Sequence, residues 1–348
     1  MSARIVPPTP AAIDDAAARL AAGALVAFPT ETVYGLGADA GNAAAVRAIF
    51  AAKGRPADHP VIVHVGGAGE LAHWARAVPA GARALAEAFW PGPLTLIVPR
   101  AAHVDDAVTG GQDSVGLRVP SHPVARALLA AFAERGGRGI AAPSANRFGR
   151  ISPTTARHVA DDLGGAVDTI LDGGRCEVGI ESTIVAFTGD EPLLLRPGGI
   201  GVAALARVLG RAPAVPGSGA GGGRGEGDLD AAVPRASGTL ASHYAPHTPA
   251  RLVPADRLRA EIAPRLARDQ RVAVLARTVP RPAEFSGVWI AAPEDAARYA
   301  HDLYANLRTL DAAEADDILI EAPPDEPEWL AVTDRVTRAA HGDEDDRD

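Results

Sequence analysis

The chain has 348 residues, of which 47% are hydrophobic and 22% are charged. This composition is typical of a globular protein, and the length predicts two domains. Cys176 is the single cysteine, which excludes a disulfide framework within the chain and favours a reducing compartment. We find no signal-peptide pattern and no window of roughly 18 uninterrupted apolar residues, so we expect a cytoplasmic protein that does not enter membranes.

The net charge of −9 is unevenly distributed along the chain. Residues 1–210 hold 18 basic and 19 acidic side chains, whereas residues 211–348 hold 16 basic and 24 acidic ones. The second part is therefore a poor surface for a polyanion such as nucleic acid. The first part is neutral enough to contain a local cationic pocket.

A polar turn near the N-terminus is the richest stretch of the sequence. We expect a first helix within residues 1–20, an apolar strand over 24–28 and a helix over 42–53, with the segment FPTETVYGLG between the last two. A turn between a strand and a helix in an α/β protein lies where ligands bind. Four polar side chains occupy this one, more than a reversal of direction needs: Thr30, Glu31, Thr32 and Tyr34.

The second predicted helix ends in Lys53-Gly54-Arg55-Pro56, where two cations flank a glycine as an anion site requires. Lys53 is the only lysine among 34 basic residues. Because arginine does not replace lysine where a compact charge must touch a phosphate, we interpret Lys53 as functional rather than as a chance surface lysine. His64 interrupts an apolar strand over 61–65, and the sequence leaves open whether it is a hydrogen-bonded core residue or part of a site.

Strands and helices continue to alternate, which predicts a layered α/β sheet. Arg118 lies inside a predicted strand over 114–120, where it either forms a structural salt bridge or binds a ligand. The segment 139–153 contains PSAN, and Ser152-Pro153 predicts the start of a helix over 153–162. Its hydroxyl and amide groups could hold a phosphate, although plain turn chemistry is the alternative.

The first domain is predicted to close with the segment GIEST, a strand ending at Arg196 and a helix over 200–209. Residues 211–238 are rich in Gly, Pro, Ala and Ser, which indicates a flexible linker. His243 and His247 follow, but Pro246 between them argues against a metal pair on one helix face. We therefore divide the chain into 1–210, a linker or lid over 211–248, and a second α/β domain over 249–345.

The second domain is predicted to contain strands over 271–276 and 317–323 and helices over 294–310 and 328–340. It carries no glycine-rich phosphate-binding fingerprint. Asp334-Arg335 in its last helix is interpreted as a surface or interface pair rather than as a catalyst.

Taken in order, the motifs PTETVYGLG, KGRP, WPGPLT, GLRVP, PSAN, GIEST and LRPGG resemble those of the Sua5/YrdC/YciO family. The linker followed by HYAP and the second domain are similar to the long Sua5 form. The resemblance implies a YrdC-like twisted open sheet with helices, joined by a Gly/Pro-rich linker to a smaller Rossmann-like α/β domain. It also implies a nucleotidyltransferase, an L-threonylcarbamoyladenylate synthase, which converts L-threonine, bicarbonate and ATP into threonylcarbamoyl-AMP and pyrophosphate.

Each motif of the family carries residue roles over to this sequence. The positions that the family uses for threonine are Thr32, His64, Arg118, Ala142 and Ser182. Those that it uses for ATP are Arg55, His59, Ser144, Asn146, Ser152 and Arg196, with Tyr244 from the linker covering the nucleotide. Lys53 and Arg55 would be the catalytic cations. His59, Phe148 and Ser237-Gly238-Thr239 depart from the usual residues at their positions.

The implied reaction needs no covalent nucleophile, because the carbamate of threonine can attack the α-phosphorus of ATP directly. Mg²⁺ is expected with ATP, and the product would pass to a tRNA threonylcarbamoyl-transferase complex for N6-threonylcarbamoyladenosine at position 37, with at most a weak or transient contact to tRNA. Two alternatives stay open. One is a non-catalytic RNA-binding protein, which the charge disfavours, and the other is an enzyme that makes a different carbamoyl or aminoacyl adenylate.

Overall fold

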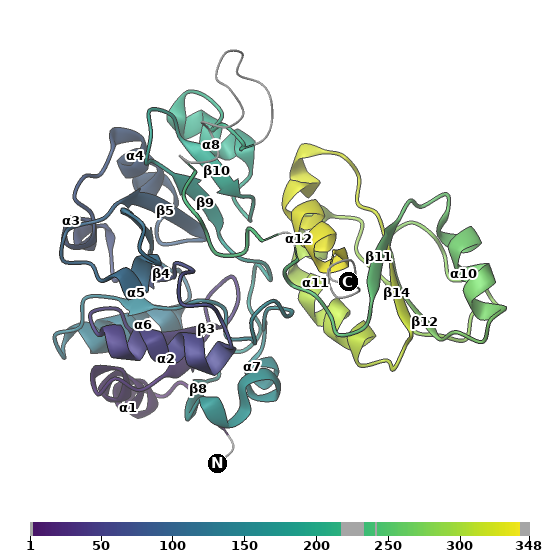
Figure 1. Ribbon diagram of the computed structural model, residues 1–348, viewed down its shortest axis with the longest axis horizontal. Coiled ribbons are helices and arrows are strands. Elements are labelled where there is room, and N and C mark those ends of the chain that lie inside the picture. The colour runs from purple at the N-terminus through teal and green to yellow at the C-terminus, as the bar shows by residue number, and fades with distance from the viewer. Residues whose placement is uncertain (1–2, 217–232, 241, 342–348) are drawn as a thin grey trace.

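The computed structural model describes residues 3–216, 233–240 and 242–341. The chain forms two lobes (Figure 1), a larger lobe built on a ten-stranded sheet and a smaller lobe built on a four-stranded sheet. This arrangement confirms the predicted α/β fold class. Within the described ranges, no helix is long and apolar enough to cross a membrane.

The sheet of the larger lobe is mixed, with strand order β1-β8-β2-β3-β7-β4-β6-β5-β9-β10. It contains both parallel pairs, such as β4 with β6, and antiparallel pairs, such as β2 with β3. Its strands are β1 (Arg4–Val6), β2 (Val26–Phe28), β3 (Gly35–Asp39), β4 (Ile62–His64), β5 (Leu94–Pro99), β6 (Ser114–Arg118), β7 (Ile140–Ala141), β8 (Thr169–Leu171), β9 (Thr183–Ala186) and β10 (Leu193–Arg196).

Local signals explain where the helices of the larger lobe begin and end. In the second helix, the Asn42 side chain accepts hydrogen bonds from the first backbone N–H groups, and Gly54 ends the helix in the left-handed conformation with φ of 64°. The helices are α1 (Pro10–Ala21), α2 (Ala43–Lys53), α3 (Leu71–Trp74), α4 (Ala80–Phe89), α5 (Asp106–Thr109), α6 (Pro123–Ala133), α7 (Ala156–Leu163) and α8 (Val202–Leu209), with single 3₁₀ turns η1 (Ala68–Glu70) and η2 (Gly164–Ala166).

Two local predictions were wrong. The segment after the polar turn does not lead directly into a helix, because Gly35–Asp39 forms strand β3 against β2. Gly37 allows this pairing, since a Cβ there would lie 2.8 Å from the Phe28 ring and 2.9 Å from Ile140. Helix α7 begins after Thr155, whose hydroxyl accepts from the His158 N–H, and not after Ser152.

The smaller lobe has a wholly parallel sheet in the order β11-β14-β12-β13. In Figure 1, α11 and α12 cover the face of this sheet that is turned toward the larger lobe, and α10 covers the other face. The elements are β11 (Ala250–Val253), α10 (Leu258–Leu266), β12 (Val272–Ala276), β13 (Trp289–Ala291), α11 (Ala296–Asp311), β14 (Asp317–Glu321), the 3₁₀ turn η3 (Pro327–Trp329) and α12 (Leu330–Ala340). Much of the predicted linker, 217–232 and 241, lies outside the described residues.

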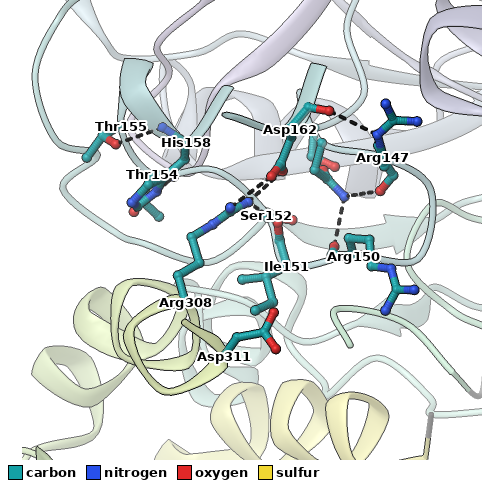
Figure 2. A network of polar contacts seen from close by, with 12 residues as sticks. Arg147, Arg150, Ile151, Ser152, Thr154, Thr155, His158, Asp162, Arg308 and Asp311 are labelled. Carbon is teal, nitrogen blue, oxygen red and sulfur yellow. Dashed lines mark hydrogen bonds and ion pairs between the residues drawn. The ribbon is translucent and has the colours of Figure 1, made fainter. Parts of the chain in front are cut away.

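The two lobes share a hydrophobic cluster and ionic contacts. Val33, Ile151 and Ile180 of the larger lobe belong to the same buried cluster as the core residues of α11 and α12. Figure 2 shows Arg308 of α11 extending to Asp162 of α7, with guanidinium and carboxylate 2.7 Å apart. The lobes are therefore packed against each other and not only joined by the chain.

Gly179 lies at this interface with a φ of 80°, and a Cβ there would overlap the backbone of His301 on α11. Gly179→Ala should destabilise the packing of the lobes by about 2 kcal/mol, because the added methyl meets backbone and the residue must keep a strained conformation. Denaturant unfolding and proteolysis between the lobes would measure the effect. Gly189→Ala is the matched control, since its Cβ would meet nothing within 4 Å. Equal stability of the two variants would contradict the prediction.

Candidate active site

One cavity opens where the polar turn after β2 meets the ends of α2, β4, β6, β7 and β10. Its empty space, with the open solvent at its mouth included, is about 630 Å³. Ser237, Gly238, His243 and Tyr244 close part of this cavity. Its lining residues are Thr30, Thr32, Val33, Gly35, Lys53, Arg55, Ile62, His64, Arg118, Ala142, Pro143, Ser144, Asn146, Phe148, Gly149, Glu181, Ser182, Arg196, Ser237, Gly238, His243 and Tyr244.

All but two of the site residues expected from the sequence lie in this lining. The four cations Lys53, Arg55, Arg118 and Arg196, which come from distant segments, share the cavity. The sequence-based roles of the individual residues stay predictions. His59 and Ser152 lie outside the lining, and the structure gives each of them another contact: the His59 ring packs on Phe148 with centroids 5.4 Å apart, and the Ser152 hydroxyl donates to the Glu181 carboxylate at 2.5 Å.

Lys53 is buried at the end of α2, and its ammonium group holds two segments of the fold together. Its Nζ donates to the backbone carbonyls of Ser144 and Asn146, both at 2.5 Å, and so joins α2 to the PSAN loop. Burial and then the charge of Arg55 lower the pKa of Lys53 well below its usual value. The two carbonyl acceptors oppose this shift because they favour the protonated amine. A lysine at this position thus bridges two carbonyls as well as facing the cavity.

Arg55 and Arg196 form a second cationic group, and both contact Ser237. The Arg55 Nη2 donates to the Pro60 carbonyl at 2.8 Å and to the Ser237 hydroxyl at 3.2 Å. The Arg196 guanidinium donates to the Ser182 carbonyl at 3.1 Å and to the Ser237 carbonyl at 2.7 Å. Burial, followed by repulsion from Arg196, lowers the pKa of Arg55 to about 10, so it still carries its charge at neutral pH.

Arg118 forms an ion pair with Glu31, with Nη2 and Oε1 2.7 Å apart and both side chains buried. Burial alone would raise the pKa of the Glu31 carboxyl, but the charge of Arg118 outweighs it and lowers that pKa. The structure therefore gives Arg118 both the salt bridge and the position in the cavity that the sequence left as alternatives. Its Nε has no hydrogen-bond partner in the part of the chain that the structure describes.

His64 lies on β4 directly beside Arg118 of β6 in the sheet register. Neither ring nitrogen has a hydrogen-bond partner among the described residues, although the side chain is only 2% exposed. Burial and the Arg118 charge lower the pKa of His64 to about 3, so the imidazole is neutral at physiological pH. Polar atoms in a cavity wall without a protein partner are available to a ligand, which favours a role for His64 in the site over that of a hydrogen-bonded core histidine.

Tyr244 lies in the cavity wall with a φ of 62°, a conformation rare for a bulky residue. Its ring packs on His243 with centroids 4.2 Å apart. A Cβ on Gly238 would overlap the Tyr244 hydroxyl, so the glycine leaves room for it. The backbone of Ala245 is held by a hydrogen bond to the Gly149 carbonyl of the larger lobe at 2.9 Å.

Sequence reasoning missed Glu181, Ser237, Gly238 and His243 as cavity residues. Glu181 is part of the GIEST segment, and the residue is 6% exposed in the cavity wall. Glu31 was noted in the polar turn, but its pairing with Arg118 was not foreseen. The described residues contain no group of three or more His, Cys, Asp or Glu that could hold a metal, which includes the neighbourhood of His243 and His247.

Comparisons with known proteins find matches over most of the chain. The family described as "Telomere recombination", Sua5/YciO/YrdC, matches residues 18–198, and the family described as "Threonylcarbamoyl-AMP synthase, C-terminal domain" matches residues 200–341. Curated threonylcarbamoyl-AMP synthases from Pyrococcus abyssi and Bacillus subtilis are each 39% identical, covering 91% of both chains in the first case and 95% and 93% in the second. The crystal structure of P. abyssi Sua5 complexed with L-threonine aligns with a TM-score of 0.84, 37% identity and 95% coverage of both chains.

Replacing Lys53 with Met should destabilise the protein even without substrates, because two buried carbonyls lose their shared donor at a cost of about 2 kcal/mol. Thermal unfolding in the absence of nucleotide would measure this. Arg47→Met, on the exposed face of the same helix, is the matched control and should change stability by less than about 0.5 kcal/mol. An unchanged melting temperature for Lys53→Met would show that Lys53 does not support the scaffold.

Proposed function

The chain belongs to the Sua5/YciO/YrdC family in its long, two-part form, and we propose that it acts as an L-threonylcarbamoyladenylate synthase. The enzyme is a nucleotidyltransferase that converts L-threonine, bicarbonate and ATP into threonylcarbamoyl-AMP and pyrophosphate for tRNA modification. The observation that supports this best is the convergence of four cations on a cavity whose wall also holds unpartnered neutral polar groups. Such a cavity fits a triphosphate next to a small zwitterion.

The chemistry divides into two steps. The threonine amine attacks the carbon of bicarbonate, a C–N bond forms, and water leaves to give the carbamate. A carbamate oxygen then attacks the α-phosphorus of ATP, and the bond to the β,γ-diphosphate breaks to release pyrophosphate. No side chain needs to form a covalent bond, so the protein contributes positioning and stabilisation of phosphate charge.

We assign the triphosphate to the side of the cavity where Arg55 and Arg196 lie. Both guanidinium groups are held by backbone carbonyls, so they are already oriented before the ligand arrives. Preorganised cations stabilise the charge that develops on the phosphoryl oxygens without reorganisation cost. Ser144 and Asn146 of the PSAN loop would contact the nucleotide, while Lys53 fixes that loop.

We assign threonine to the side where Arg118 and His64 lie. Arg118 would bind the threonine carboxylate, a charge-assisted pairing for which its free Nε is suited. The neutral His64 ring, Thr32 and Ser182 offer hydrogen bonds to the amine and hydroxyl of the substrate. Ala142 contributes an apolar contact of the right size for the methyl group.

Mg²⁺ would enter with ATP, held mainly by phosphate oxygens and water. The donor set fits this expectation, since Glu181 is the one carboxylate in the described lining and already accepts three hydrogen bonds. The ion would supply charge neutralisation on the triphosphate. The protein's own share is to orient the phosphates through its arginines.

Exclusion of water protects the carbamate and the adenylate, both of which hydrolyse. We propose that the segment around Ser237 and Tyr244 acts as a lid, because it contacts Arg55 and Arg196 and lines the cavity. The adenylate would then pass to a separate tRNA-modifying complex, since the acidic second part of the chain is a poor surface for RNA. A cytoplasmic location stays a prediction.

Pyrophosphate release by the purified protein should require ATP, threonine and bicarbonate together. Serine should not replace threonine, and carbamoyl phosphate should not replace bicarbonate. Arg118→Met should raise the KM for threonine at least about tenfold and Arg196→Met the KM for ATP, because a charge-assisted hydrogen bond is worth ~1.5–3 kcal/mol. Salt-sensitive RNA binding without pyrophosphate release would instead favour the RNA-binding alternative, and turnover with another amino acid the alternative adenylate enzyme.

Tyr244→Phe removes a buried hydroxyl that lies beside Gly238 in the cavity wall but keeps the ring. We expect a lower yield of intact adenylate per ATP consumed, because water reaches the intermediate more easily. Chromatographic measurement of adenylate against AMP would show this. Tyr299→Phe, which removes a hydroxyl that is buried in the smaller lobe, is the control. The lid proposal is wrong if both variants give the yield of the unmodified protein.

A further inference from the structure

Glu181 places a carboxylate in the wall of a cavity that is lined by four cationic side chains, and this carboxylate accepts three hydrogen bonds. The Ser152 hydroxyl donates to Oε1 at 2.5 Å, and the Tyr304 hydroxyl and the Arg335 Nε both donate to Oε2 at 2.8 Å. Two of these three donors belong to α11 and α12 of the smaller lobe. The smaller lobe therefore supplies most of the groups that hold this carboxylate.

Arg335 is the most deeply buried charge in this network, with 0% of its surface exposed. Asp334 accepts a second hydrogen bond from its guanidinium at 2.6 Å. The guanidinium carbon also lies 5.2 Å from the centre of the Tyr244 ring, the same ring that lines the cavity. Asp334-Arg335 is thus a pair at the lobe interface and not on the surface.

Glu181 is charged in this setting. Burial alone would raise its pKa, but the charges of Arg335 and then Arg196 outweigh burial and hold the pKa at about 2. Arg196 in turn feels the charge of Glu181. Two cations, one from each lobe, therefore act on one carboxylate: Arg335 pairs with it directly, and Arg196, which donates to the neighbouring Ser182, acts through its charge.

The charge of Glu181 matters for the binding of a polyanionic ligand. An unneutralised carboxylate in the wall would repel a triphosphate, and it would also attract Arg196 away from the phosphates. The ion pair with Arg335 prevents both effects, because it neutralises Glu181 with a cation from the smaller lobe.

We propose that Arg335, contributed by the smaller lobe, is a positioning residue for ATP: it holds Glu181 in an ion pair and so keeps Arg196 available for the triphosphate. This inference rests on the proposed function, which places a triphosphate in the cavity. It gives the smaller lobe a part in nucleotide binding through a residue that does not touch the nucleotide.

The experiment compares Arg335→Met with the double variant Glu181→Gln/Arg335→Met in the full-length protein. ATP affinity is measured by calorimetry, with the KM values for ATP and threonine from pyrophosphate release. Arg335→Met should weaken ATP binding about tenfold or more, since it leaves a buried carboxylate unpaired. The threonine KM should change less than about threefold, and the double variant should bring ATP affinity back to within about threefold of the unmodified protein.

Arg308→Met is the matched control, because it breaks another ion pair between the lobes, that with Asp162. It should lower the melting temperature and leave ATP affinity unchanged. If Arg335 had only a structural role, Arg335→Met would behave like Arg308→Met, or it would weaken ATP and threonine binding equally and Glu181→Gln would not restore ATP affinity. Either result overturns the proposal.

Two further outcomes are decisive. If Arg335→Met does not fold, Glu181→Gln alone still tests the idea: it should bind ATP at least as tightly as the unmodified protein, and weaker binding contradicts the proposal. Failure of the proposed function is recognised separately, because the unmodified protein would then bind ATP but release no pyrophosphate in response to threonine and bicarbonate.

Discussion

Mutual repulsion among cations gathered in one buried cavity is the constraint on which the rest of the structure depends. Burial lowers the pKa of both Arg55 and Arg196, and a second arginine lowers each further, Arg196 acting on Arg55 and Arg335 on Arg196. The fold compensates with backbone carbonyls, such as those of Ser144 and Ser182, and with the carboxylate of Glu31. Because these acceptors occupy fixed positions at strand and helix ends, the cations are oriented as well as stabilised.

The mixed sheet explains why these groups meet. Strands β4 and β6 are neighbours although 49 residues lie between them in the chain, and they bring His64 beside Arg118. Arg196 is the last residue of β10, the strand at one end of the sheet order, and its guanidinium lines the cavity while donating to Ser182. The site is therefore a product of long-range strand pairing, with the polar turn after β2 as its floor.

The smaller lobe, over its described residues, supports the cavity wall without lining the cavity itself. Its α11 and α12 pack on the larger lobe through a shared hydrophobic cluster and through the buried network around Glu181. The same helices support the Tyr244 ring, which lies 5.6 Å from that of Tyr304. The proposed lid residue Tyr244 therefore rests on the same residues, Tyr304 and Arg335, that pack the two lobes together. Ligand binding in the cavity and packing of the lobes thus depend on shared residues.

Local signals in the sequence determined most of the elements, and the resemblance of its ordered motifs to a family indicated part of the cavity lining. The Asn42 and Gly54 caps defined α2, the isolated Lys53 marked the end of that helix, and ordered motifs indicated eleven residues that do line one cavity. Tertiary structure alone decided the rest, because it depends on groups far apart in the chain. Gly35–Asp39 became a strand through packing against Phe28 and Ile140, Ser152 left its expected capping role to bind Glu181, and Arg335 reached Glu181 across 154 residues. No local pattern encodes such a contact, since its energy comes from burying two opposite charges together.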